Sequence, residues 1–407
     1  MAAKPLAGIR VIDLTRVLAG PWASQMLADL GAEVIKVERP RRGDDSRGYG
    51  PPFLQSKAGE NLAATTMFLA ANRGKKSITI DIAKPDGRAL LKQLVAGADV
   101  LIENYKVGDL ARYGLDYEGL RAINPRLVYC SVTGFGLTGP YKNRPGYDPI
   151  AQAMCGMMSV TGHPLGQPGG GPMKAGPSIV DLFTGLYAVV AIQGALRARD
   201  RDGEGQQVDV SLLDCGVAMM AQQAMQFLLT GVPPTHLGTQ ANGGAPGGGF
   251  HCADGDIMIA PGNDEGYIRM VTAIGHPELA TDPRFVTNGQ RLKHRQLIND
   301  ILNGIFADWS VARLAETLTA AKVPASPILD LGQVVAHPQV QARGMVRQVP
   351  HPEAGTVALI GNPIQFSRTP LGDAPAPPAL GQHTDAVLRE LGISAEEIER
   401  LRQAAIV

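Results

Sequence analysis

The segment Ile9–Val37, IRVIDLTRVLAGPWASQMLADLGAEVIKV, decides the fold of this chain. Ile9–Thr15 is apolar and β-branched, which predicts a buried strand. A helix is predicted from Pro21, a residue favoured at the first helical position, to Gly31. Glu33–Val37 is the next strand. The segment is therefore a short β-α-β unit, which is typical of a parallel α/β sheet.

The turn of this unit argues against several common functions. It reads TRVLAGPW and lacks the G-x-G-x-x-G fingerprint, so no nicotinamide site is predicted. The chain also shows no Walker A loop, no G-x-S-x-G elbow and no His and Cys cluster with zinc spacing. Hydrolase, NTPase and metal-site interpretations lose their usual support.

Basic residues recur near the ends of successive predicted strands. Further strands are expected within Asn72–Ile82, Asp99–Asn104, Leu127–Gly136 and Gly205–Asp214, and a further helix is expected over Leu212–Leu229. The basic residues near the strand ends are Arg39, Lys75, Lys106 and Arg112. Ligand clefts form at the carboxyl ends of parallel strands, and cationic side chains suit phosphates. This pattern predicts a pocket for a polyphosphate ligand, although scattered surface cations would give the same pattern.

A second informative segment is Lys174–Gln206, KAGPSIVDLFTGLYAVVAIQGALRARDRDGEGQ. We expect a helix from Asp181 that ends at Arg197 and Arg199, where basic side chains suit the helix dipole. Asp181 then lies in the first turn, among free backbone N–H groups. It is either an N-terminal cap or a carboxylate kept ionised at neutral pH to attack a carbonyl. The local pattern does not decide between these roles.

The later part of the chain predicts a second domain. The glycine-rich stretch Gly243–Gly249, GGAPGGG, is either a loose surface loop or a mobile lid. Short strands and amphipathic helices alternate after it. We therefore expect a large α/β domain over residues 1–222, a smaller α+β domain over 223–328, and a C-terminal return to the large domain over 329–407. His383 is expected to be structural or capping rather than a base.

Composition limits the partners and the compartment. Of 407 residues, 38 are Lys or Arg and 38 are Asp or Glu, so the net charge is zero and neither nucleic acid nor a membrane is an expected partner. The N-terminus lacks the apolar core of a signal peptide, and no uncharged apolar run approaches a membrane span. The four cysteines are far apart, which suggests reduced thiols in a cytoplasmic protein.

Taken together, ordered blocks along the whole chain resemble the class III CoA-transferase family, which includes formyl-CoA transferase, carnitine CoA-transferase and α-methylacyl-CoA racemase. The blocks are PLAGIRVIDLTRVLAGPWASQMLADLGAEVIKVERP, DVLIENYKVGDLARYGL, GYDPIAQAMCG, GPSIVDLFTG, GEGQQVDVSLLD and PALGQHTDAVLRELG. The resemblance implies an open, parallel, Rossmann-like sheet in a large domain and a smaller central domain. It also implies an interlocked homodimer with the active site between domains of both subunits.

The resemblance further implies the chemistry. Asp181 matches the catalytic aspartate, which attacks an acyl-CoA to form an anhydride and then an aspartyl-CoA thioester. The glycine-rich loop, with Gly247, Gly248 and Gly249, would exclude water and stabilise the oxyanion. The residues implied or expected to contact CoA are Val17, Arg39, Lys75, Asn104, Lys106 and Arg112. Acyl-CoA and a carboxylic acid are the expected substrates, with no metal and no permanently bound cofactor.

Three positions that face the substrate in the family refine the expectation. Leu18 stands where formyl-CoA transferase has glutamine, and Tyr49 stands where it has tryptophan. Tyr147 stands where the racemase has its histidine base, so transfer is favoured over racemisation. The block ERPRRGDDSRGYGPPF looks most like succinyl-CoA:dicarboxylate (glutarate-type) members, whose acceptor has a second carboxylate that a nearby arginine could hold. A racemase or epimerase, and a non-catalytic CoA-binding protein of the same fold, are the alternatives.

Overall fold

The computed structural model describes residues 3–407, and the chain divides into two compact units. The large unit comprises the chain up to Met157, Lys174–Gly231 and Gln341–Val407. The small unit comprises Met158–Met173 and Val232–Val340. The predicted domain boundaries after residues 222 and 328 stay a prediction.

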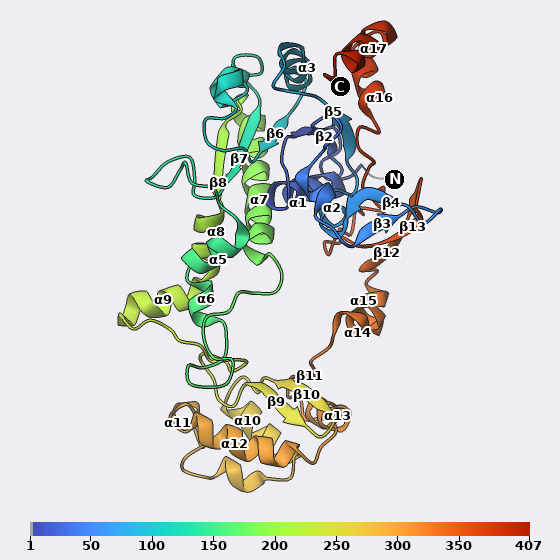
Figure 1. The fold of residues 1–407 in the computed structure, drawn as a ribbon. Coiled ribbons are helices and arrows are strands. Elements are labelled where there is room, and N and C mark those ends of the chain that lie inside the picture. The colour runs from blue at the N-terminus through green and yellow to red at the C-terminus, as the bar shows by residue number, and fades with distance from the viewer. Residues whose placement is uncertain (1–2) are drawn as a thin grey trace. The chain divides into compact units, whose positions relative to one another are not determined.

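A six-stranded parallel sheet forms the centre of the large unit (Figure 1). Its strand order is β5-β2-β1-β6-β7-β8. The strands are β1 (Arg10–Asp13), β2 (Glu33–Glu38), β5 (Lys76–Thr79), β6 (Val100–Glu103), β7 (Val128–Thr133) and β8 (Gln207–Ser211). In the register, Val11 of β1 lies opposite Val34 of β2 and Val100 of β6. The predicted open parallel sheet is confirmed.

Helices cover both faces of this sheet because its strands are apolar on both sides. On one face lie α1 (Ala19–Asp29), α5 (Asp148–Met154), α7 (Ile179–Asp202) and α8 (Leu212–Met219). On the other face lie α3 (Pro85–Ala96), α4 (Tyr117–Arg121), α16 (Thr384–Glu390) and α17 (Ala395–Gln403). The C-terminal helices therefore return to the large unit, where the backbone of His383 bonds to Ser77 of β5 and its ring accepts from the Ser77 N–H.

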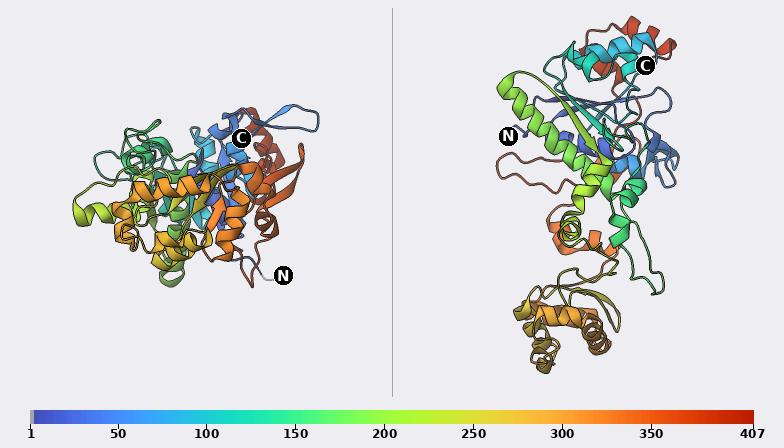
Figure 2. Two further views of the ribbon diagram at one scale, coloured as in Figure 1. Left: turned by 90° about the horizontal axis from the view of Figure 1, so that it is seen from below. Right: turned by 90° about the vertical axis from the view of Figure 1, so that its left-hand side faces the viewer.

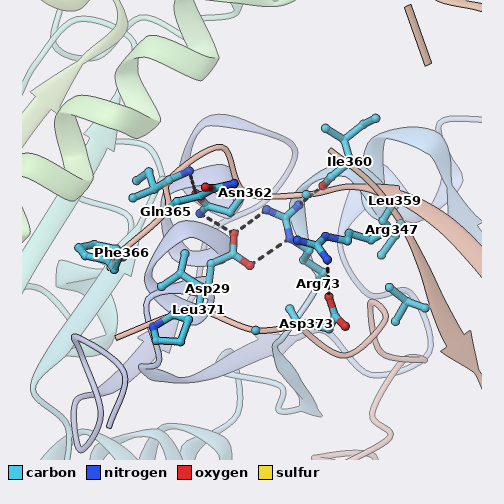
Figure 3. A pocket seen from close by; sticks show the side chains of 16 residues that line it. Asp29, Arg73, Arg347, Leu359, Ile360, Asn362, Gln365, Phe366, Leu371 and Asp373 are labelled. Atoms are coloured by element: carbon cyan, nitrogen blue, oxygen red, sulfur yellow. Dashed lines mark hydrogen bonds and ion pairs between the residues drawn. The ribbon is translucent and has the colours of Figure 1, made fainter. Parts of the chain in front are cut away.

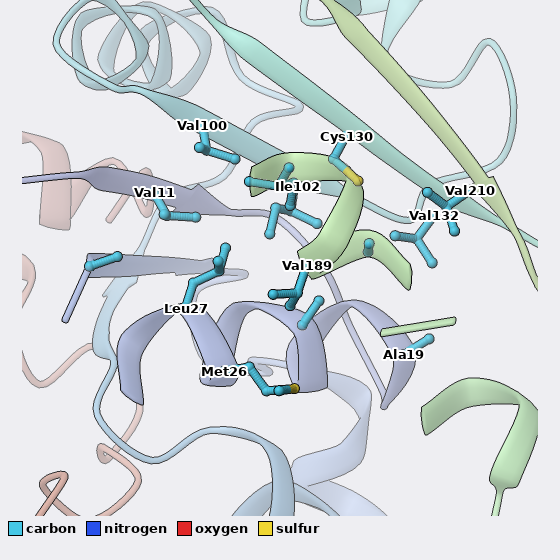
Figure 4. Close-up of a cluster of buried hydrophobic side chains, with 14 of the residues drawn as sticks. Val11, Ala19, Met26, Leu27, Val100, Ile102, Cys130, Val132, Val189 and Val210 are labelled. Carbon is cyan, nitrogen blue, oxygen red and sulfur yellow. The ribbon is translucent and has the colours of Figure 1, made fainter. Parts of the chain in front are cut away.

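The first core layer shows how neighbouring strand residues separate the two faces. Val11 packs into the layer with α1 and α7, whereas Ile12 packs into the opposite layer with α3. Figure 4 shows Val11 and Ile102 of the sheet beside Leu27 of α1 and Val189 of α7. Figure 2 shows α7 running alongside the strands, in agreement with its packing against β7 and β8. The core thus fixes α7, the helix that carries Asp181.

Three helices differ from their predicted bounds. α1 begins at Ala19 rather than Pro21 and ends at Asp29 rather than Gly31. α7 begins at Ile179 and ends at Asp202, so Asp181 is its third residue rather than its first. The single helix predicted over Leu212–Leu229 is two helices, α8 and α9 (Ala221–Thr230). Ala221 has φ 37°, outside the helical region, which breaks the run between them.

The order of strands creates a site for ligands beside β1. The chain builds β1, β2 and β5 outward in one direction and then places β6, β7 and β8 on the other side of β1. The connection after β1 therefore runs toward β2, and the connection after β6 runs the opposite way, toward β7. A crevice forms at such a switch point, outside the carboxyl ends of the strands.

The small unit is α+β, as predicted. Its antiparallel sheet has the order β11-β10-β9, with β9 (Gly248–Cys252), β10 (Gly255–Ile259) and β11 (Ala325–Pro327). Its helices include α10 (Asp264–Ala273), α11 (Asn288–Lys293), α12 (Arg295–Phe306), α13 (Val311–Ala320) and α14 (Leu331–Ala336). Phe250, Tyr267, Phe285 and Phe306 lie in its own buried core.

The remaining elements are short. They are α2 (Thr66–Ala71), α6 (Met157–Val160), α15 (Pro338–Ala342), the 3₁₀ helices η1 (Asp45–Gly48), η2 (Ala111–Tyr113) and η3 (Pro277–Ala280), and the hairpins β3–β4 (Phe53–Gln55, Asn61–Thr65) and β12–β13 (Val346–His351, Gly355–Ile360). Within residues 3–407, α7 alone has the length and hydropathy that a membrane-crossing helix would need, a test that core helices of globular proteins also pass. All four cysteines are free; Cys130, Cys155 and Cys215 are buried, and Cys252 is partly exposed.

A core substitution in α3 tests the packing of the second layer. Leu91 is fully buried, so Leu91→Ala should lower the free energy of unfolding of the large unit by about 2–5 kcal/mol. Urea unfolding in a Trp309→Phe background measures this, because Trp22 is then the only tryptophan and lies in the large unit.

The exposed neighbour Gln93 supplies the control in the same helix. Gln93→Ala should change the unfolding free energy by no more than about 0.5 kcal/mol. Equal losses for the two variants would contradict the assignment of this helix face to the core.

Candidate active site

A cavity of about 220 Å³ lies where β1, β6 and β7 end, at the switch point of the sheet. It brings together seven residues that the sequence predicted for the site: Val17, Leu18, Tyr49, Asn104, Lys106, Tyr147 and Asp181. These residues come from segments up to 164 positions apart. The fold therefore brings together, from distant segments, seven of the thirteen residues predicted for the site.

Asp181 does not cap its helix. The N-cap position of α7 is Ser178, and its side chain makes no capping hydrogen bond. Instead, Oδ1 of Asp148 accepts from the backbone N–H groups of Val180 at 2.8 Å and Asp181 at 3.1 Å. Asp148 lies in the first turn of α5, and its Oδ2 accepts from Gln152. The capping interpretation of Asp181 is wrong, and its carboxylate is left to face the cavity.

The ionisation of Asp181 also differs from the sequence expectation. Burial raises the pKa of the Asp181 carboxyl to about 7, and the negative charge of Asp148 raises it further in the same direction. The expected effect of the helix dipole, which would keep this group ionised, is outweighed. Near pH 7 the Asp181 carboxyl is therefore divided between its ionised and protonated forms.

A buried network of charges lies beneath the loop after β1. Nζ of Lys36 pairs with Asp44 at 2.8 Å, and both side chains are fully buried. Nζ of Lys75 bonds to Asp13 at 3.0 Å, to the Pro21 carbonyl and to Asn72. Burial lowers the pKa of Lys75 to about 8. The Lys75 ammonium thus has three partners inside the protein and does not reach the cavity.

This network holds the loop that shapes the cavity. The Val17 N–H donates to Asp44, and Val17 has φ 71°, in the left-handed region that β-branched residues avoid. The side chain of Asn104 accepts from the N–H of Arg16 and donates to its carbonyl, at 2.9 and 2.8 Å. One amide therefore ties the segment after β6 to the segment after β1. Asn104 acts on the backbone of the site in this structure.

The lining of the cavity is cationic. Arg16, Lys106, Lys142 and Arg144 face two carboxylates, Asp45 and Asp181, which gives a formal charge of +2 when both are ionised. Lys106, Lys142 and Arg144 are exposed. The guanidinium of Arg144 lies 3.6 Å from the centre of the Tyr141 ring. Anionic substrates suit such a lining.

Sequence reasoning missed several of these residues, and some had a recognisable signal. Lys36 interrupts the apolar run VIKV of residues 34–37, and a buried lysine needs a carboxylate partner. Lys142 and Arg144 form a short basic run just before Tyr147. Asp148 directly follows Tyr147, but its capping of α7 has no local signature because the two partners are 32 positions apart.

The other predicted residues do not line this cavity. Arg39 is exposed after β2, and Arg112 is exposed and pairs with Asp109 at 2.9 Å. Gly247, Gly248 and Gly249 belong to the small unit, where Gly248 and Gly249 open β9. Gly248 has φ 152°, and a Cβ there would lie 2.8 Å from the Thr239 carbonyl oxygen, so glycine is required locally. Their lid role stays a prediction.

A second cavity of the large unit, about 280 Å³, is a weaker candidate (Figure 3). Its charged groups are already paired. Arg73 binds Asp29 through two nitrogens, at 3.0 and 2.5 Å, and Asn362 donates to the same carboxylate. Arg347 faces Asp373 at 3.4 Å. None of the residues predicted for the site lines this cavity. Within residues 3–407 no group of His, Cys, Asp and Glu could hold a metal ion.

Comparison with known proteins identifies the family. The model of CoA-transferase family III matches residues 6–384. The chain belongs to CoA-transferase family III. The succinate–glutarate CoA-transferase of Agrobacterium fabrum is 48% identical over 97% of both chains, and the succinyl-CoA:glutarate CoA-transferase of Mus musculus is 39% identical over 99% of this chain and 90% of that protein. A crystal structure of a CAIB/BAIF family protein from Brucella suis superposes with a TM-score of 0.85 at 44% identity, covering 96% of this chain and all of the other.

The predicted family and enzyme class are confirmed. This family III CoA-transferase is an enzyme of the class III type, a transferase with a Rossmann-like α/β sheet. CoA thioesters and carboxylates fit the family as substrates. The cationic cavity with Asp181 on its wall agrees with those anionic substrates.

The pKa of Asp181 gives a test of the site. Asp148→Asn removes the neighbouring charge but keeps an Oδ1 acceptor for the first turn of α7, so the pKa of Asp181 should fall below about 7, while burial, the larger cause of the shift, still holds it above the ordinary value. Carbon-13 NMR of labelled aspartate, titrated from pH 4 to 9, measures it. Asp45→Asn removes another carboxylate of the cavity and should leave the Asp181 pKa in place.

The same shift has a consequence for stability. A raised pKa means that the folded state binds the proton more tightly than the unfolded state. The contribution of Asp181 to the free energy of unfolding is therefore complete below about pH 4 and is lost as the pH rises through about 7. In Asp148→Asn this loss should occur at lower pH. An unchanged titration of Asp181 in Asp148→Asn would contradict the proposed influence of Asp148.

Proposed function

We propose that this CoA-transferase moves CoA from succinyl-CoA to a dicarboxylate such as glutarate, with Asp181 as its covalent nucleophile. The observation that carries the proposal is the uncapped carboxylate of Asp181 on the wall of a cationic cavity at the sheet switch point. Its relatives support the substrate class, since two of them are named succinate–glutarate and succinyl-CoA:glutarate CoA-transferases.

The first half of the proposed reaction removes the donor acid. An Asp181 carboxylate oxygen attacks the thioester carbonyl, the C–S bond breaks, and a mixed anhydride and CoA thiolate form. The thiolate then attacks the Asp181 carbonyl of the anhydride. The bond between the Asp181 carbonyl carbon and the bridging oxygen breaks, succinate leaves with that oxygen, and Asp181 is held as an aspartyl-CoA thioester.

The second half runs these steps in reverse with the acceptor. The acceptor carboxylate attacks the aspartyl-CoA carbonyl and releases CoA thiolate, which forms a second anhydride. The thiolate attacks the acceptor carbonyl of this anhydride, giving the new acyl-CoA and free Asp181 carboxylate. No proton or electron is gained or lost, and the thioester energy is conserved across the exchange.

The environment of Asp181 suits this chemistry. A carboxylate whose pKa lies near 7 is a stronger base and nucleophile than an ordinary aspartate, yet a useful fraction is ionised at neutral pH. Water would hydrolyse both intermediates. We therefore retain Gly247, Gly248 and Gly249 as the proposed lid and oxyanion donors.

The cations divide into two proposed roles. Exposed Lys106, together with Arg39 and Arg112, provides charge for the CoA phosphates at the ends of the strands. Lys75 would contribute through its bonds to Asp13 and Pro21, which support the loop containing Val17. In this proposal Val17 and Asn104 define the wall along which CoA lies.

The residues that face the cavity do not favour racemisation. Tyr147 lines the cavity and is 62% exposed. Its phenol, unlike the imidazole of a histidine, does not act as the base that removes an α-proton at neutral pH. Leu18 also lines the cavity, where formyl-type members have a glutamine, so the amide of that glutamine is missing here. Exchange of the α-hydrogen of an acyl-CoA for deuterium without an acceptor acid would favour the racemase alternative.

We further propose that the enzyme is a homodimer. Phe183, Leu186, Tyr187 and Val190 recur three or four positions apart on α7 and are 38% to 68% exposed, so they form an apolar stripe. Met225, Phe227, Leu228 and Leu229 of α9 are 44% to 80% exposed. Apolar surface of this extent marks an interface with another protein, and a second copy of the chain is the occupant we propose.

Covalent trapping tests the proposed nucleophile. After incubation with succinyl-CoA, hydroxylamine should convert the activated Asp181 side chain to a hydroxamate, visible by peptide mass spectrometry. Asp181→Ala should lose at least about 1000-fold in kcat because the covalent route is absent. Full activity of this variant would exclude Asp181 as the nucleophile.

Asp214 is the matched control for this experiment. It is the third residue of α8, as Asp181 is of α7, but it does not line the cavity. Asp214→Asn should keep wild-type kcat, and its peptide should carry no hydroxamate. Labelling of Asp214 as strong as that of Asp181 would show that any first-turn aspartate reacts.

The dimer is tested by placing a charge within the α7 stripe. Val190→Asp should shift the mass measured by light scattering from two chains toward one, because an unpaired carboxylate in an apolar interface is costly. Ile123→Asp charges a 40% exposed apolar residue outside α7 and α9 and should leave the mass unchanged. A monomeric wild-type enzyme would contradict the proposal.

A further inference from the structure

One arginine of the cavity has an unused, buried hydrogen-bond donor. Arg16 lies directly after β1, and its side chain is 29% exposed. Its Nη1 pairs with Asp45 at 3.0 Å, and its guanidinium lies 5.1 Å from the centre of the Tyr105 ring. Its Nε is shielded from solvent and has no hydrogen-bond partner. A buried N–H without a partner is rare in folded proteins and indicates a missing acceptor.

The position of Arg16 is fixed from both sides. Asn104 bonds to its backbone N–H and carbonyl, and the following residue, Val17, is held by Asp44. Because Nη1 bonds to Asp45, the other edge of the guanidinium, with Nε and Nη2, remains for a ligand, and a rotation of the side chain has to uncover Nε, which solvent does not reach. The other cations of the lining, Lys106, Lys142 and Arg144, are exposed. No side chain of the cavity bonds to their backbone as Asn104 does to that of Arg16. Arg16 is thus the preorganised cation of the site.

We propose that Arg16 binds the distal carboxylate of the diacid, while the reacting carboxyl group is at Asp181. This inference rests on the proposed function and names the residue that selects dicarboxylates. Arg16 and Asp181 line the same cavity of about 220 Å³, which has room for about seven water molecules or one short diacid chain. A carboxylate matches the guanidinium edge through two parallel N–H···O bonds.

The same contact would serve both halves of the reaction. Succinyl-CoA and glutarate each have a free carboxylate at the end remote from the reacting carbonyl, and each acyl group occupies the anhydride with Asp181 in turn. Leu18 lines the cavity as an apolar side chain and offers no competing hydrogen bond to the chain between the two carboxyl groups. Acids without the distal carboxylate leave the Nε donor unpaired, so they are disfavoured.

The test compares two acceptors of equal chain length. With succinyl-CoA as donor, kcat/KM is measured for glutarate and for pentanoate, which lacks the second carboxylate. In a ping-pong reaction this quantity reports only the acceptor half, so slower loading of the enzyme does not affect the comparison. In Arg16→Gln the glutarate-to-pentanoate ratio should fall about 100-fold, with kcat/KM for pentanoate nearly unchanged. Arg16→Lys keeps the charge but not the fork and should give an intermediate ratio.

Arg42→Gln is the matched control. Arg42 is 3.7 Å from the same Asp45, but its side chain is 73% exposed and does not line the cavity. The ratio in this variant should equal that of the wild type. Equal losses for both acceptors in Arg16→Gln and Arg16→Lys would show a structural role, and an unchanged ratio would assign the carboxylate to another cation. Either result overturns the inference.

The proposed function has a separate outcome in this experiment. Failure of the wild type to transfer CoA to any acid would refute the proposed function itself. Transfer to pentanoate as efficient as to glutarate would leave the transferase intact but remove the diacid preference and, with it, the role of Arg16. Preference for glutarate in both wild type and Arg16→Gln would refute the role of Arg16 alone.

Discussion

The site depends on the hydrogen bonds that the Asp148 carboxylate accepts from the first turn of α7. The free N–H groups of a helix terminus need acceptors, and here a residue of α5 supplies one. Because Asp148 takes this role, the side chain of Asp181 is released from it. The same negative charge adds to burial in raising the pKa of Asp181. The Asp148 carboxylate therefore both caps α7 and raises the pKa of Asp181.

A second constraint is the buried charge network below the loop after β1. Burying a lysine and a carboxylate costs solvation energy that their attraction and hydrogen bonds only offset when the geometry is good. Lys36 and Asp44 meet this condition at 2.8 Å, and Asp44 also holds the Val17 N–H. The unusual backbone of Val17 is thus maintained by groups that no ligand touches. The cavity wall at Val17 is therefore supported from inside the protein.

The sequence predicted the local elements well and their long-range partners poorly. The β-α-β unit at Ile9–Val37, the parallel sheet and the apolar helix that contains Asp181 all follow from periodicity and turn residues. The capping of α7 by Asp148 does not, because it depends on how two distant helices pack. Periodicity also could not show that Lys75 points into the protein, since a lysine before a strand has the same pattern whether its ammonium is buried or exposed. The family resemblance selected Asp181, Val17 and Asn104, whereas the unpartnered Nε of Arg16 became visible only in three dimensions.

The central claim is that an oxygen of Asp181 enters the anhydrides of the reaction. Turnover with succinyl-CoA and glutarate labelled with oxygen-18 in its carboxyl groups tests this most directly. The acceptor oxygen that bridges the anhydride stays on the enzyme when thiolate attacks the acyl carbonyl. Mass spectrometry of the peptide that contains Asp181 should therefore show uptake of the label at this side chain alone, dependent on succinyl-CoA. An enzyme that turns over fully while Asp181 stays unlabelled, or that acquires the label at another residue, would contradict the account.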